Sequence, residues 1–209
     1  MAGLVVRIID KRVGRSFDPP LSTDIVCGPA TDLNDIFAQV ADMAYAKKIE
    51  TLLIMSHGFY NLDDKGRERY GFGIELGQQN LKMGNVEAML GRLAGRFASA
   101  GRGIELRGCG AAARSEFTVH HGGKPLVLVG DGIALCQRIA DVTGTGVLAS
   151  SDEQPGPCRV VPAGQPTRIN GNVGTTPDSE MALCPVGVWE GKVWLFTPKA
   201  ATPKAFLQR

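Results

Sequence analysis

Short apolar runs alternate with segments of helical periodicity as far as residue 150. The runs have the length of strands, and 51–55 (TLLIM) is apolar throughout, which is typical of a parallel strand covered on both faces. Between the runs, apolar residues recur every three or four positions, as on one face of an amphipathic helix. The predicted strands are 4–9, 51–55, 103–107 and 146–150, and the predicted helices are 31–48, 85–100 and 132–142.

The alternation of strands and helices predicts an α/β fold. We expect a three-layer αβα sandwich, with a mostly parallel sheet and helices on both faces. Residues 59–83 are polar and glycine-rich, with a hairpin expected around 70–76, and a C-terminal hairpin is expected from 186–188 and 192–196. The predicted domain is 1–196, and 197–209 is too proline-rich and basic to continue the sheet, which indicates a surface tail.

Composition narrows the classes of function. A net charge of +2 gives no basis for binding nucleic acid or a membrane surface. The apolar start of the chain is interrupted by Arg7 and Asp10, so it is too short for a signal peptide, and no segment reaches the length of a membrane span. The five cysteines form no CxxC pair. A cytoplasmic location is therefore expected, with no disulfide framework, metal or cofactor.

Reactive residue types follow two of the predicted strands. His57 and Gly58 come directly after 51–55, and Cys109 lies between two glycines after 103–107. Because the carboxyl ends of parallel strands meet at one edge of a sheet, we expect His57 and Cys109 to lie within reach of each other. A cysteine is mostly protonated at neutral pH, and a neighbouring imidazole can accept its proton. The backbone amides of Gly58 and Cys109 would serve as oxyanion donors.

These two motifs resemble the caspase-like cysteine peptidases of clan CD, in which an apolar strand ends in His-Gly and a later one in Gly-Cys. The two residues are separated by 109 − 57 = 52 positions, close to the roughly 50 of caspases. The caspase signature Gln-Ala-Cys-x-Gly is replaced by Arg107-Gly-Cys-Gly-Ala111, which favours the bacterial caspase-like and metacaspase-like families. The resemblance implies a caspase-like fold and a cysteine endopeptidase that cleaves a protein or peptide substrate.

The resemblance extends downstream to residues 139–154, which are similar to the next helix and strand of these folds. In metacaspase-like members an aspartate just after this strand helps to bind Lys or Arg. Asp152 matches that position best and Glu153 second, which implies cleavage after a basic residue.

Control of such a peptidase raises a further expectation. With no prodomain and no cleaved signal in the sequence, we expect a bacterial toxin or effector that is exported without a cleaved signal peptide and held by a bound inhibitor or immunity protein. A lack of toxicity when the chain is expressed alone would contradict this expectation.

Other interpretations of the same residues stay open. His-Gly at a strand end is often only a turn, and cysteine is often a small buried apolar residue, as Cys136 on the apolar stripe of a predicted helix is expected to be. His120-His121 is expected in a surface loop. The main alternative is a non-catalytic caspase-like interaction module with an unreactive thiol. A third class is a thiol-dependent acyltransferase or amidohydrolase, whereas the missing GxSxG elbow disfavours a serine hydrolase.

Overall fold

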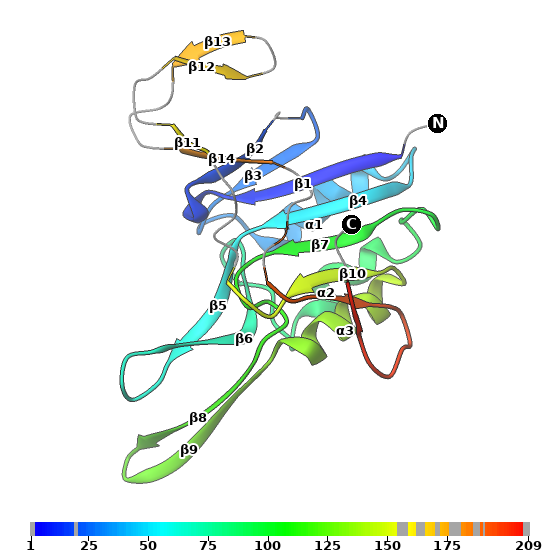
Figure 1. Cartoon of the computed structure of the whole chain (residues 1–209). Helices are drawn as coiled ribbons and strands as arrows, with labels where there is room; N and C mark the ends of the chain where they lie inside the picture. The colour runs from blue at the N-terminus through cyan, green and yellow to red at the C-terminus, as the bar shows by residue number, and fades with distance from the viewer. Residues whose placement is uncertain are drawn as a thin grey trace.

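A seven-stranded sheet in the order β16-β15-β10-β7-β4-β1-β3 forms the centre of the computed structural model (Figure 1). The strands from β3 to β10 are parallel, and β15 and β16 run antiparallel to their neighbours. The structure describes residues 3–18, 21–153, 159–161, 166–169, 172–175, 181–185, 189 and 191–206. The strands of the sheet are β1 (Leu4–Asp10), β3 (Asp24–Cys27), β4 (Ile49–Met55), β7 (Gly103–Arg107), β10 (Val147–Ser150), β15 (Val193–Phe196) and β16 (Lys204–Ala205).

The helices and the strands outside this sheet occupy the connections. Two hairpins follow β4 and β7, and both project from the edge where those strands end (Figure 1). The hairpins are β5 (His57–Leu62) with β6 (Glu68–Glu75) and β8 (Arg114–His121) with β9 (Lys124–Asp131). The helices are η1 (Lys11–Val13), α1 (Leu33–Met43), α2 (Val86–Leu90), η2 (Gly91–Leu93) and α3 (Gly132–Thr143). The remaining strands are β2 (Arg15–Asp18), β11 (Arg159–Val161), β12 (Pro166–Ile169), β13 (Asn172–Thr175) and β14 (Met181–Pro185).

The α/β architecture and the mostly parallel sheet agree with the sequence pattern. All four predicted strands belong to the central sheet. Helix α1 begins after Asp32, whose carboxylate accepts a hydrogen bond from Asn34 N at 2.7 Å, as expected of an N-cap. Helix α3 begins after Asp131 in the same way and ends at Gly144, which has a left-handed φ of 69°.

The prediction of helices on both faces is wrong for the α-helices of the described residues, which all lie on one face of the sheet; the short helix η1 packs on the opposite face through Val13. Helix α2 contacts both α1 and α3, and all three pack into one core cluster with Leu52 and Ile54 of β4. The alternate positions Leu53 and Met55 are buried on the opposite face in a separate cluster. A continuous apolar run therefore predicted correctly that both faces of β4 are covered, but such a run does not specify that helices cover them.

The predicted helix 85–100 is also wrong beyond Leu93. The Asn85 side chain does not cap the helix; it accepts a hydrogen bond from Lys82 N and donates one to Asn80 O. Gly95 then adopts a positive φ of 70°, and the backbone of residues 96–98 hydrogen-bonds to Ile49 at the start of β4. Pairing with the start of β4 thus replaces the second half of the helix.

The C-terminal segment differs in part from its prediction. Residues 186–188 of the expected hairpin lie outside the described residues. Strand β15 pairs with β10 on one side and with β16 on the other. Lys204–Ala205 therefore adds an edge strand, so the prediction that 197–209 does not continue the sheet is wrong at these two residues. None of the helices in the described part of the chain has the length and apolar character needed to cross a bilayer.

The helix-covered core predicts a contrast between two leucines. Leu52 is fully buried in it, whereas Leu62 on β5 is 53% exposed. We expect Leu52→Ala to lower the free energy of unfolding by about 2–5 kcal/mol, because it removes buried methyl groups and leaves a cavity. Leu62→Ala is the matched control and should change it by less than about 1 kcal/mol. Chemical denaturation of both variants measures the difference, and equal losses would contradict the packing.

Candidate active site

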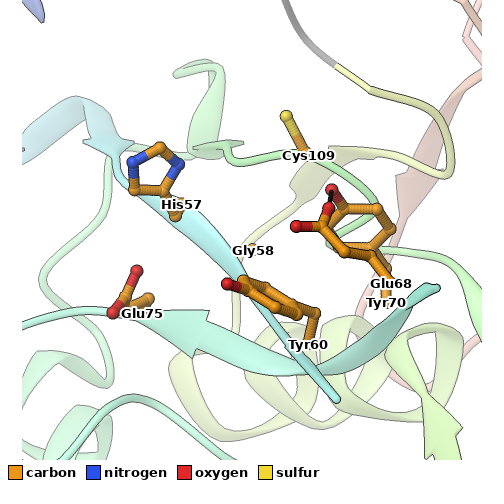
Figure 2. A pocket seen from close by; sticks show the side chains of 7 residues that line it. All are labelled: His57, Gly58, Tyr60, Glu68, Tyr70, Glu75 and Cys109. Carbon is orange, nitrogen blue, oxygen red and sulfur yellow. Dashed lines mark hydrogen bonds between the residues drawn. The ribbon is translucent and has the colours of Figure 1, made fainter. Parts of the chain in front are cut away.

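The register of β4 and β7 brings His57 and Cys109 together. Met55 pairs with Arg107 at the end of this parallel ladder, and each chain continues two residues further to reach its reactive side chain. Both side chains line one pocket of about 300 Å³ (Figure 2). His57 and Cys109 therefore lie at the same edge of the sheet, as predicted from the strand ends.

A close backbone approach at Gly58 sets the shape of this pocket. A Cβ atom at Gly58 would lie 1.9 Å from the carbonyl oxygen of Cys109, which no side chain tolerates. The following Gly110 has a φ of 57° and donates its N–H to Asp152 O at 2.9 Å. A Cβ there would lie 2.5 Å from Cβ of Tyr70. Glycine is thus required on both sides of the contact between the cysteine turn and the β5–β6 hairpin.

The imidazole of His57 is oriented by a backbone carbonyl. Its Nε2 lies 3.2 Å from the carbonyl oxygen of Arg12 in η1. A carbonyl only accepts hydrogen bonds, so Nε2 carries the hydrogen, and Nδ1 of the neutral ring has the free lone pair. Figure 2 shows one ring nitrogen facing the side of the pocket where Cys109 lies and the other facing away. The ring is therefore held in the tautomer that a proton acceptor for Cys109 needs.

The walls of the pocket come from the β5–β6 hairpin. Tyr60 and Tyr70 lie edge to face with ring centroids 6.0 Å apart. Tyr70 donates its hydroxyl hydrogen to Glu68 Oε2 at 2.5 Å. Burial, followed by the hydrogen bond and charge of Glu68, raises the pKa of Tyr70, so the phenol stays protonated. Glu75 completes the acidic lining (Figure 2).

These wall residues were missed because residues 59–83 were described as polar and glycine-rich, with a hairpin expected only around 70–76. One signal could have found them. Tyr70, Phe72 and Ile74 alternate with other residues in ERYGFGIE, which is the period of a strand, and this segment follows soon after His57. Pairing of that strand back onto the residues after His57 places its side chains beside the imidazole.

Asp152 and Glu153 lie differently from the two catalytic candidates. The Asp152 carboxylate accepts a hydrogen bond from Lys192 N at 2.6 Å, and Asp152 is not among the residues that line the pocket. Its carbonyl supports the cysteine turn through Gly110. Glu153 is exposed, and its charge contributes to the raised pKa of Tyr70. A substrate-binding role for these two residues stays a prediction, and the acids that line the pocket are Glu68 and Glu75.

The other cysteines described with their side chains differ from Cys109 in burial. Cys136 is fully buried in the core, as predicted, and Cys27 is buried at the end of β3. Burial raises the pKa of both thiols, that of Cys27 to about 11. Cys109 is only half-buried. Of these three thiols, Cys109 is thus the one that solvent and a substrate can reach.

Metal chemistry has no evident location in the described residues, where no three His, Cys, Asp or Glu side chains gather as metal ligands. His120 and His121 are exposed at the tip of the β8–β9 hairpin, at the surface as predicted. They lie in a strand there and not in a loop.

Comparison with protein-family models gave no match, and comparison with curated proteins and with solved structures gave none either. The clan CD resemblance therefore continues to depend on the two motifs.

The close approach at Gly58 predicts that this position is intolerant of substitution. Gly58→Ala should displace the cysteine turn, lower the midpoint of thermal unfolding and abolish any activity that depends on Cys109. Gly84→Ala is the matched control, because a Cβ at Gly84 meets nothing within 4 Å. Thermal unfolding of both variants tests the contact. A Gly58→Ala protein as stable as the wild type would show that the two backbones are further apart.

Proposed function

We propose that this chain is a cysteine endopeptidase in which Cys109 is the nucleophile and His57 the general base and acid. The observation that carries the proposal is the shared pocket at the ends of β4 and β7, in which His57 is held with Nδ1 as its free nitrogen. A thiol beside an oriented imidazole is the arrangement that nucleophilic catalysis by cysteine requires.

The chemistry follows in two stages. Cys109 Sγ attacks the scissile carbonyl carbon as its proton passes to Nδ1 of His57, and His57 then gives that proton to the departing amine. This leaves an acyl-enzyme thioester. Water, deprotonated by His57, attacks the thioester carbonyl, and the proton returns to Sγ as the acid product leaves.

The backbone amides of Gly58 and Cys109 are the proposed donors to the oxyanion. The close approach of Gly58 to the Cys109 carbonyl supports this assignment, because it brings the two peptide segments together at one end of the pocket. A preorganised donor of this kind contributes roughly 3 kcal/mol to stabilisation of the transition state.

The lining of the pocket favours a cationic group in the substrate, so cleavage after Lys or Arg is part of the proposal. Glu68 and Glu75 supply negative charge, and the rings of Tyr60 and Tyr70 supply faces on which an ammonium or guanidinium group can rest. Glu75 already forms an ion pair with Arg12, whereas the partner of Glu68 is the neutral hydroxyl of Tyr70. Glu68 is therefore the better candidate to bind the substrate's charge.

The proposal predicts cleavage that depends on Cys109. Wild type and Cys109→Ala are compared on short reporter peptides with Arg, Lys, Asp or Asn before the scissile bond. We expect the wild type to cleave after Arg or Lys and the variant to be inactive, since the acyl-enzyme cannot form. Cleavage after Asp or Asn instead would keep the dyad and reject the cationic pocket. Equal behaviour of the two folded proteins on every peptide would favour the non-catalytic interaction module.

The acidic wall predicts a change in specificity when its charge is removed. Glu68→Gln should raise KM for peptides with Arg or Lys by roughly tenfold, because a charge pair in a partly enclosed site is lost. Glu87→Gln removes a similar charge, from a carboxylate that binds Arg138 outside the pocket, and should leave KM unchanged. An unchanged KM for Glu68→Gln would place the cationic subsite elsewhere.

A further inference from the structure

An arginine anchored at three points provides the carbonyl that holds His57. Arg12 lies in η1, immediately after β1, and its carbonyl oxygen is the partner of His57 Nε2. The His57 side chain is otherwise exposed at the first residue of β5. The orientation of the ring thus depends on a segment of chain that belongs to neither strand of the dyad.

The guanidinium of Arg12 joins the end of β1 to the end of β6. Nε and Nη2 donate to the two carboxylate oxygens of Asp10 at 2.9 and 2.6 Å. Nη1 donates to Glu75 Oε1 at 3.0 Å, and Nη2 also reaches the carbonyl of Gly77 at 3.0 Å. The planar fork of arginine makes these contacts at the same time, which a lysine ammonium cannot.

Asp10 is more deeply buried than Arg12 and Glu75, its partners in this network. Its side chain is fully buried, and it accepts further hydrogen bonds from the backbone N–H of Arg12 and of Gly77. Burial acts to raise the pKa of Asp10, but the hydrogen bonds from Arg12 and Gly77 outweigh it and hold the pKa below its usual value. The carboxylate of Asp10 is therefore charged, and it binds both the guanidinium and the backbone N–H of Arg12.

Glu75 connects this network to the pocket. It is the cross-strand partner of His57 in the β5–β6 ladder, and it lines the pocket together with His57. Figure 2 shows its carboxylate on the His57 side of the pocket. Glu75 thus binds the side chain of Arg12, whose carbonyl orients the imidazole, and also pairs with the backbone of His57.

We propose that Arg12 and Glu75 are positioning residues that fix the imidazole of His57 for proton transfer with Cys109. The inference builds on the proposed function, because it assigns these residues to the same dyad. It goes beyond that function in making the dyad depend on an ion-pair network between β1 and β6. A misplacement of the ring by about 1 Å is enough to cost up to about 100-fold in rate.

The test measures alkylation of Cys109 by iodoacetamide in the 209-residue chain, followed by peptide mass spectrometry. The variants are Arg12→Lys, Glu75→Ala and His57→Gln. The matched control is Arg67→Lys, which makes the same change in an arginine that binds Asp63 away from the pocket lining. A small neutral reagent avoids any effect of the variants on binding of a charged substrate.

We expect Arg12→Lys and Glu75→Ala to slow alkylation several-fold towards the rate of His57→Gln, and Arg67→Lys to match the wild type. Removal of a negative charge at Glu75 would by itself favour the thiolate and speed the reaction. A slower reaction therefore reports lost positioning. In reporter cleavage, Arg12→Lys should lower kcat about tenfold or more with KM changed less than about twofold. Glu75→Ala keeps the test valid if Arg12→Lys does not fold.

The outcomes separate the two proposals. Wild-type and His57→Gln proteins that react equally fast would overturn the dyad, and the positioning inference with it. The second outcome is a wild type that reacts faster than His57→Gln while the folded Arg12→Lys and Glu75→Ala proteins react as fast as the wild type. That result would overturn the positioning inference alone and leave the peptidase proposal standing.

Discussion

The close approach of two backbones at Gly58 is the constraint on which the rest of the site depends. β4 and β7 pair side by side, so the segments that follow them begin next to each other. These segments can contact each other because Gly58 has no side chain to clash with the Cys109 carbonyl. Gly110 leaves room for the Tyr70 side chain in the same way. This contact brings together the segments that carry His57 and Cys109, whose side chains line one pocket, without long side chains to order. The entropic cost of forming the site is therefore met largely by the fold.

The surroundings of that contact come from segments far apart in the sequence. β1 contributes Asp10 and, just after it, Arg12; the β5–β6 hairpin contributes the tyrosines and both glutamates. The Arg12 guanidinium links these two segments through hydrogen bonds to the carboxylates of Asp10 and Glu75. Strands of the central sheet lead directly to His57 and Cys109, and the β5–β6 hairpin supplies most of the pocket wall, which is a common division between scaffold and specificity.

The sequence predicted the parts of this arrangement that follow from period and position. Short apolar runs located four strands of the sheet, helical periodicity located α1 and α3, and the strand ends located His57 and Cys109. It failed where tertiary pairing decides the local structure. Residues 96–98 pair with Ile49 instead of completing a helix, and the hairpin expected around 70–76 instead begins at His57 and ends at Glu75. Arg12 was missed for the same reason, since its role rests on a backbone carbonyl that contacts a residue 45 positions away.

The central claim, that His57 activates Cys109 towards a peptide carbonyl, is tested most directly with a peptidyl-lysine chloromethyl ketone. The thiolate attacks the methylene carbon of this reagent and displaces chloride, which leaves a thioether on the cysteine. Mass spectrometry of the digested protein identifies the modified residue. The account predicts a single adduct on Cys109 that forms rapidly in the wild type and slowly in His57→Gln, while the buried Cys27 and Cys136 stay unmodified. An adduct on Cys109 that forms equally fast in both proteins, or none at all, would contradict it.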